Sequence, residues 1–284
     1  MSYLLLFKRF MKKGLLTIVQ LVIGFCSVAQ EDAFKASWIS PVKIDGNPQE
    51  WNLPMHYYDN NTKLFFAFAN DEEKLYLCFQ THDEMTQSKI MQAGMKVSVG
   101  FKGKHKVMVY FPLEQKTAFT LTADNRDALQ RTDRENRRKN FLVQQNMMEV
   151  KGFTSREGTI PIHDSSGINA AMNWDAKNAM TYEISIPLKE IFGPAYTSAD
   201  LSKILTMDAI INALKEHLET SGGTNPYSRR AYSERMGAGK GSGNKTDKGM
   251  NETNPLLTRE ERAEMFEKSE FTQRFTLAQA KSAN

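Results

Sequence analysis

Aromatic side chains stand next to amide and carboxylate side chains at two places in the sequence. Trp174 lies between Asn173 and Asp175, and a turn-like Ala-Lys-Asn run follows. Tyr57 and Tyr58 precede an Asp-Asn-Asn run. A flat aromatic ring can pack against the C–H face of a sugar ring, while planar polar groups bond its hydroxyls. Both places therefore have the residue types that sugar binding needs.

We predict Trp174 and Asp175 as ligand-binding residues, and Tyr57 and Tyr58 as a second candidate set. For Trp174 an alternative stays open, namely a tryptophan that packs in the core at the end of a strand. The tyrosine pair is open in the same way, because the sequence alone does not show whether the two rings face solvent.

The sequence has few other combinations of residues that could bind a metal or a cofactor or catalyse a reaction. Asp83 and Glu84 have the oxygen donors that calcium prefers, but an adjacent pair in a loop more often faces solvent. The five histidines are scattered without zinc-type spacing. A haem held by His82 with Met85 or Met95 is disfavoured, because methionines in strands usually fill the core. The sequence also has no Ser-His-Asp set or phosphate-binding glycine loop. We therefore expect a non-enzymatic protein without metal or cofactor.

The first 29 residues have the pattern of a secretory signal. Met1–Lys13 contains four basic residues, Gly14–Phe25 is almost wholly apolar, and Ser27–Ala29 supplies small residues for cleavage after Ala29. The apolar run is shorter than the roughly 20 residues that span a bilayer. We expect a periplasmic or secreted protein without a membrane span after cleavage, and translation from either Met1 or Met11.

The net charge depends on this leader. The chain has 37 Lys and Arg against 33 Asp and Glu. Removing the four basic residues of the leader leaves 33 of each sign, so the mature protein is formally neutral and a nucleic-acid partner is not expected. Cys78 is then the only cysteine, which excludes a disulfide within the mature chain.

Most apolar residues alternate with polar ones, which is the period of a β-strand with one buried face. Two hairpins are predicted, over 64–79 around an Asn-Asp-Glu-Glu turn and over 95–111 around Lys-Gly-Lys. So many antiparallel strands require two packed sheets or a barrel. Further strands are predicted at 119–122, 141–150, 158–162, 169–174 and 181–186.

Four segments depart from that alternation. Asn125–Asn140 is dense in charge of both signs and is predicted to be a solvated helix or a long loop. Ser221–Asn254 is rich in Gly, Asn, Ser and Lys, and we expect disorder there. A capping box that begins at Thr258 predicts a short helix before a last strand, Phe271–Leu277. Leu201–Leu218 fits both the helical and the strand period.

The order of several motifs resembles the family 9 carbohydrate-binding modules and the related DOMON-like β-sandwiches. The resemblance runs from about residue 42 to residue 214, with a closing strand at the tail. It rests on Ile44-Asp45-Gly46, Glu50-Trp51, Leu75–Phe79, Asp83 and Tyr182–Leu188.

This resemblance implies a mostly β, antiparallel β-sandwich of the secreted bacterial type, and it favours a strand at 205–213. It implies a non-catalytic, extracytoplasmic carbohydrate-binding module or accessory protein, with a glycan as the ligand. The alternative is a sandwich without a sugar site that contacts envelope proteins. The family's sugar sites place the ligand between two aromatic residues, and the sequence does not reveal such a pair.

The expected organisation is one sandwich domain with interruptions. Residues 1–29 form the signal, 30–220 the sandwich, 221–254 a disordered Gly-rich loop, and 255–284 a short helix and closing strand. Asp45 and Gly46 suit a turn. Trp51 is expected to plug the open end of the sandwich, and Glu183 to point outward between two core residues.

Overall fold

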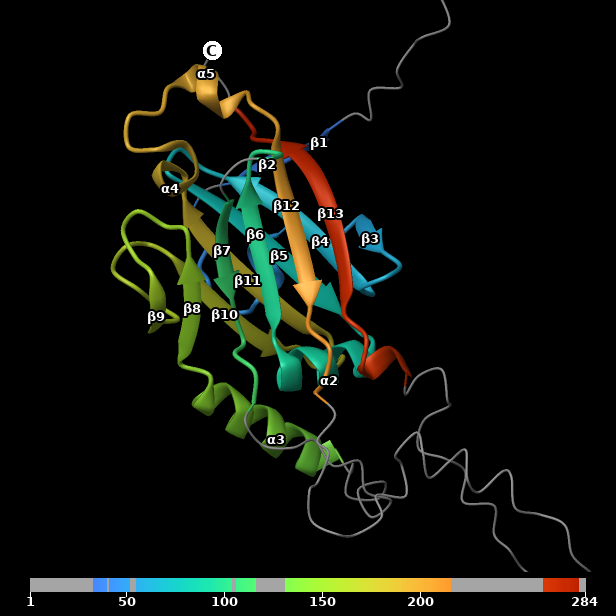
Figure 1. Ribbon diagram of the computed structural model, residues 1–284. Coiled ribbons are helices and arrows are strands. Elements are labelled where there is room, and N and C mark those ends of the chain that lie inside the picture. Colours follow the sequence, from blue (N-terminus) through green and yellow to red (C-terminus); the bar gives the residue numbers. More distant parts are fainter. Residues whose placement is uncertain are drawn as a thin grey trace, which may run out of the picture. The chain divides into compact units, whose positions relative to one another are not determined.

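The computed structural model describes residues 33–39, 41–51, 55–103, 106–115, 131–215 and 263–280. Over these residues two β-sheets pack face to face, with helices at their ends (Figure 1). The mostly β sandwich that the alternating pattern predicts is therefore confirmed. The predicted signal, the strand at 119–122 and the Gly-rich segment 221–254 lie outside the described residues.

The larger sheet has seven strands. Its pairs are antiparallel, except that β1 runs parallel to β13. From one edge to the other the order is β1 (Phe34–Lys35), β13 (Ser269–Thr276), β12 (Leu205–Ile211), β6 (Met95–Gly100), β7 (Lys106–Tyr110), β8 (Met147–Lys151) and β9 (Gly158–Pro161).

The smaller sheet has six strands. Short β2 and β3 both pair with β4, β2 in parallel and β3 antiparallel. The order is β10 (Asn169–Trp174), β11 (Met180–Pro187), β5 (Lys74–Thr81), β4 (Leu64–Asn70) and β2 (Ser37–Trp38), with β3 (Tyr57–Asp59) beside β4. Strands β10 and β3 thus lie at opposite edges of this sheet.

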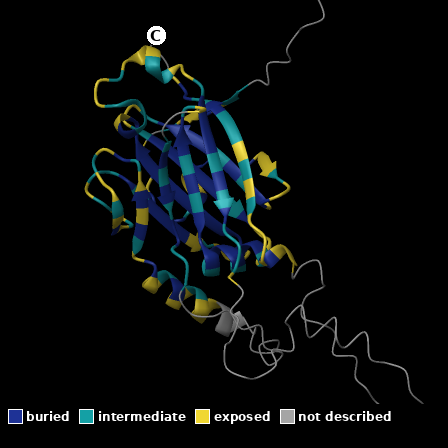
Figure 2. Cartoon of the chain, viewed as in Figure 1, coloured by how far each residue is buried: buried dark blue, intermediate teal, exposed yellow. Residues whose placement is uncertain are grey.

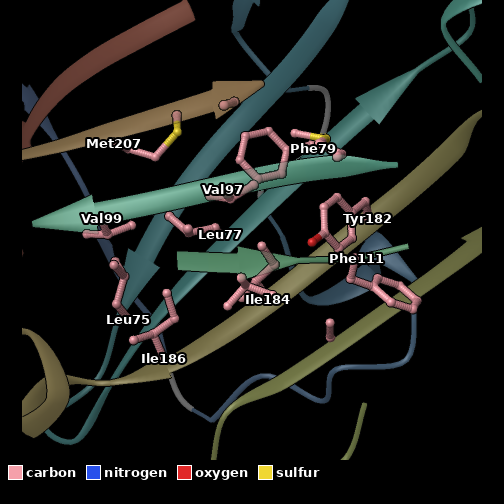
Figure 3. Packing of buried hydrophobic residues seen from close by; sticks show 14 of the residues in the cluster. Leu75, Leu77, Phe79, Val97, Val99, Phe111, Tyr182, Ile184, Ile186 and Met207 are labelled. Atoms are coloured by element: carbon pink, nitrogen blue, oxygen red, sulfur yellow. The ribbon is translucent and has the colours of Figure 1, made fainter. Parts of the chain in front are cut away.

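The main core fills the space between the two sheets and comes from alternate residues of each strand. Tyr182 lies in its middle, with ring centroids 6.0 Å from Phe79 and 5.7 Å from Phe111 (Figure 3). Burying one such side chain contributes about 1.5–3 kcal/mol. The buried positions, drawn dark blue in Figure 2, concentrate in the central strands.

A second apolar cluster covers the outer face of the smaller sheet. The segment 41–51 crosses that face and packs Val42, Ile44 and Trp51 on Tyr76 and Cys78. This segment includes the 3₁₀ turn η1 (Pro48–Glu50). Central strand β11 is therefore buried on both faces, and we call 41–51 the outer segment.

Glu183 fastens the outer segment to the sheet. Its carboxylate accepts hydrogen bonds from the backbone N–H of Asp45 (3.1 Å) and Gly46 (2.8 Å) and from Trp51 Nε1 (2.7 Å). Burial raises the pKa of the Glu183 carboxyl, and these three donors act in the opposite direction. Gly46 has φ +77°, and a Cβ there would lie 2.6 Å from the backbone nitrogen of Asn173.

Two expectations for these residues need correction. Glu183 does point away from the main core, but it is fully buried because the outer segment covers it. Trp51 is 5 % exposed, as expected of a core residue, yet it lies in the cluster on the outer face instead of plugging the end of the sandwich.

Two helices lie at one end of the sandwich, α2 (Glu84–Ala93) and α3 (Arg131–Gln144), drawn at the bottom of Figure 1. The alternating pattern did not predict α2. Helix α3 begins within the charged run, and it replaces the first part of the predicted strand 141–150 because Phe141 packs into the core from its last turn. Short helices α4 (Leu188–Phe192) and α5 (Ser198–Leu201) follow β11.

The C-terminal elements agree with expectation where they are described. The ambiguous stretch 201–218 contains strand β12, which places Leu205, Met207, Ala209 and Ile211 in the core. Residues 263–265 are helical and precede the closing strand β13. The start of the predicted helix, at Thr258, lies outside the described residues.

Candidate functional site

Trp174 ends strand β10, and the next five residues form a tight turn. Asp175 Oδ1 accepts hydrogen bonds from the backbone N–H of Lys177 and of Ala179, both at 2.8 Å. Asn178 has φ +65°, a conformation that asparagine tolerates better than most residues. One oxygen of Asp175 therefore shapes the turn that places Asn178 beside Trp174.

The Trp174 side chain is half-buried. Its ring faces the main core at the end of the sheet and meets Phe141 of α3 edge to face, with centroids 6.2 Å apart. The indole therefore packs on the core and also lines a surface hollow, and its role in ligand binding stays a prediction.

Gln87 of α2 is the centre of the polar contacts around this indole. Its Oε1 accepts hydrogen bonds from Trp174 Nε1 (2.9 Å) and from Arg138 Nη2 (3.0 Å). Its Nε2 donates to the backbone oxygens of Thr81 (3.1 Å) and Asn178 (2.9 Å). The four contacts join α2 to α3, β5, β10 and the turn after β10.

Arg138 brings a positive charge to the same place. Its guanidinium carbon lies 5.0 Å from the centre of the Trp174 ring, within the range of a cation–π contact. Its Nη1 donates to Asn178 Oδ1 at 2.8 Å. The guanidinium thus occupies part of one face of the indole and holds the Asn178 side chain.

These side chains line an open hollow of about 430 Å³ between α3 and the turn after β10. Its walls combine an aromatic ring, two asparagines and charges of both signs, a mixture that suits an uncharged ligand with many hydroxyl groups. We call this the Trp174 hollow. It is lined by Glu135, Arg138, Lys139, Leu142, Asn173, Trp174, Asp175, Ala176 and Asn178.

The two tyrosines of the second candidate set lie far from this hollow in the sheet. They belong to β3, whereas Trp174 belongs to β10 at the opposite edge. Tyr57 is 48 % exposed and packs edge to face on Phe34, at 4.3 Å between centroids. Tyr58 is 43 % exposed and lies on Phe65, at 4.7 Å. As neighbours in a strand the two rings point to opposite faces, so they do not enclose one ligand.

The structure also places the residues of the weaker alternatives. Asp83 is the N-cap of α2, where its Oδ1 accepts from the backbone N–H of Thr86 at 2.7 Å. Met95 is fully buried in the main core. Among the residues that the structure describes, no group of three His, Cys, Asp or Glu side chains is placed to hold a metal ion.

Of the residues in and around the hollow, the sequence patterns marked Trp174 and Asp175 as ligand-binding and did not single out Gln87 or Arg138. Gln87 lies on a helix that the alternating pattern did not predict, and nothing in its local sequence marks it. Arg138 belongs to the charged run 125–140. The high charge density of that run indicates solvent exposure and does not single out the contact between Arg138 and Trp174. Within the described part of the chain, no helix has the length and apolar character to cross a membrane.

Comparison with solved structures gives weak likenesses, one of which is to a carbohydrate-binding module. The chain matches no family model and no curated protein sequence. A family 9 carbohydrate-binding module from Caldicellulosiruptor kristjanssonii, solved in complex with glucose, is similar to the chain with 14 % identity and a TM-score of 0.29. The alignment covers 65 % of this chain and 80 % of that module.

Proposed function

We propose that this protein is a non-catalytic carbohydrate-binding protein that acts outside the cytoplasm and holds a glycan in the Trp174 hollow. The observation that supports this most is the composition of the hollow: a half-buried indole is bordered by the amides of Asn173 and Asn178 and by charged groups of both signs. The basic, then apolar leader with small residues before position 30 supports the location.

A glycan array with the purified mature protein tests this proposal. We expect binding in the micromolar to millimolar range, and Trp174→Ala should weaken it by about 1 kcal/mol or more, which is roughly fivefold or more. Trp38→Ala is the matched control, because Trp38 is a partly exposed tryptophan in β2, near the opposite edge of the sheet. Equal losses in both variants would contradict a site at Trp174.

The tyrosine pair of β3 supplies a second control. Tyr57→Ala and Tyr58→Ala should leave glycan affinity unchanged if the Trp174 hollow is the site. A loss in Tyr58→Ala with none in Trp174→Ala would move the site to β3.

One observation favours a different function, that of an interaction protein without a sugar site. Arg138 covers part of the indole face on which a sugar would stack. If the guanidinium always stays on the indole, the contact between Arg138 and Trp174 is structural and joins α3 to β10. Absence of binding across a broad glycan array would support this second candidate, and copurification of an envelope protein would then identify the partner.

A further inference from the structure

The amide of Gln87 has partners for its full hydrogen-bonding capacity. A glutamine side chain offers two donor hydrogens and an oxygen with two lone pairs. Here both hydrogens face backbone oxygens, of Thr81 and Asn178, and the oxygen faces two donors, on Trp174 and Arg138. Because a flipped amide would set donors against donors, the contacts fix its orientation.

The Gln87 side chain is also held in one conformation. The residue is 3 % exposed, and it lies in the first turns of α2, a helix capped by Asp83. A buried side chain with four partners from separate elements keeps one rotamer, because each alternative leaves buried polar groups without partners. Gln87 Oε1 is therefore a fixed acceptor for both the Trp174 indole and the Arg138 guanidinium.

We propose that Gln87 is the positioning residue of the Trp174 hollow, which sets the tilt of the indole and the place of the Arg138 guanidinium before a ligand arrives. This inference rests on the proposed function, because it assigns Gln87 a part in glycan affinity. Preorganised side chains lose less conformational freedom when a ligand binds, and the affinity rises accordingly.

Three variants separate this role from a general contribution to stability. Gln87→Met keeps the length of the side chain and removes all four hydrogen bonds. Gln87→Glu keeps the acceptors for Trp174 and Arg138 but turns a carboxylate oxygen toward two backbone oxygens. Thr86→Val is the matched control: Thr86 is 7 % exposed on the same helix, and its hydroxyl donates to Thr62 O at 3.5 Å, away from the hollow.

The first measurement needs no ligand. In an NMR spectrum of ¹⁵N-tryptophan-labelled protein the indole N–H groups of Trp38, Trp51 and Trp174 give separate signals, and Trp174→Phe assigns the third. Gln87→Met should shift the Trp174 signal and leave the Trp51 signal, whose group bonds Glu183, in place. Gln87→Glu should keep the Trp174 signal near its wild-type position, because the acceptor remains.

The second measurement is the affinity for the glycan found with the wild-type protein. We expect Gln87→Met to lose about tenfold, Gln87→Glu to recover part of that loss, and Thr86→Val to change affinity less than about threefold, since it breaks no contact of the hollow. Thermal unfolding of each variant shows whether it is folded at the temperature of the assay.

The outcomes distinguish the two proposals. An unmoved Trp174 signal in Gln87→Met, or equal affinity losses in Gln87→Met and Thr86→Val, overturns the positioning role while glycan binding by the wild-type protein stands. If the wild-type protein binds no glycan, the proposed function fails and the affinity role of Gln87 fails with it. The NMR result then reports only whether Gln87 orients the indole.

Discussion

A carboxylate at a binding site can shape the backbone around the site or contact the ligand, and variants of Asp175 distinguish these two roles. Sequence reasoning predicted Asp175 as a ligand-binding residue, and the structure shows Oδ1 bonded to two backbone N–H groups of its own turn. An asparagine keeps one acceptor oxygen with this geometry, whereas an alanine removes it. Comparing Asp175→Asn with Asp175→Ala therefore distinguishes the turn-forming role of the side chain from any role of its negative charge.

We expect Asp175→Ala to lower the free energy of unfolding by about 1–2 kcal/mol, because two backbone donors lose their acceptor. Asp175→Asn should lose less than half of that, and chemical denaturation measures both. In the glycan assay Asp175→Asn should bind like the wild type if only the turn matters. A large affinity loss at wild-type stability would instead assign the carboxylate to ligand contact.

Glu183 predicts a pH dependence with a definite sign. Burial raises the pKa of its carboxyl above the value of an unfolded chain, so the folded state binds this proton more readily. The contribution of Glu183 to stability is then full below the unfolded pKa and is lost as the pH rises through the folded pKa. Nearby Asp45, whose pKa is lowered chiefly by its hydrogen bond with Lys43, has the opposite dependence.

Glu183→Gln isolates this dependence because it removes one titrating group and leaves Asp45 in place. We expect the stability advantage of the wild type over Glu183→Gln to be largest near pH 4 and to shrink toward pH 7, measured by denaturant unfolding across that range. The variant should still be less stable overall, since an amide has a single acceptor oxygen for three donors. An advantage that grows with pH would show that the three donors outweigh the burial.

Helix α2 supports the candidate site. It carries Gln87 toward the hollow and Lys89 toward the other side, where the buried ammonium donates to Glu267 O at 2.7 Å and to Ser269 Oγ at 3.0 Å. Burial lowers the pKa of Lys89. The helix therefore links the Trp174 hollow to the start of the closing strand β13.

Asp83→Ala should destabilise the protein by about 1 kcal/mol, because the N-cap loses its acceptor for the Thr86 N–H. Asp83→Asn should be nearly neutral, since asparagine caps helices as well as aspartate does. Thermal unfolding compares the two. Equal destabilisation by both variants would mean that the charge of Asp83, and not its capping hydrogen bond, is what stabilises this region.

The central strands could be predicted from sequence because the alternation of apolar and polar residues is visible within each single strand. Leu64, Phe66 and Phe68 alternate because one face of β4 is buried, and the structure confirms this. Helix α2 was missed because its buried residues include Thr86, Gln87 and Lys89, polar side chains that give no apolar stripe. The part of the hollow at Trp174 and Asp175 could be predicted because both belong to one short segment, whereas the contributions of α2 and α3 come from segments that are distant in sequence.

Within the described residues, the first strand, β1, and the last, β13, meet at one edge of the larger sheet. β1 pairs with the end of β13, and the Asn70 amide bonds both the backbone N–H (2.8 Å) and the carbonyl (3.0 Å) of Ala278. β13 lies between β1 and β12 and contributes Phe275, which is fully buried against Phe68. The last strand of the described residues is thus an internal strand of the sheet.

Truncation after Lys268 should therefore prevent folding, because it removes all seven residue pairs with β12 and opens the main core at Phe68. Circular dichroism and the absence of a cooperative unfolding transition would show this. A chain that ends at Ala280, the last described residue, is the control and should unfold like the full protein. Cooperative unfolding of the shorter chain would mean that β13 is dispensable for the sandwich.

We expect the protein to be exported from the cytoplasm. The first 29 residues, which we predict to be a signal, have a basic start, an apolar stretch and small residues before position 30, and strand β1 begins at Phe34. Cleavage after Ala29 therefore leaves every described strand intact, so the processed protein should fold like the unprocessed domain. Expressed with its leader in a bacterial host, the protein should be recovered outside the cytoplasm with an intact mass that starts at Gln30. Retention of the leader in a cytoplasmic fraction would contradict the location, and cleavage beyond Phe34 would remove β1 and lower stability.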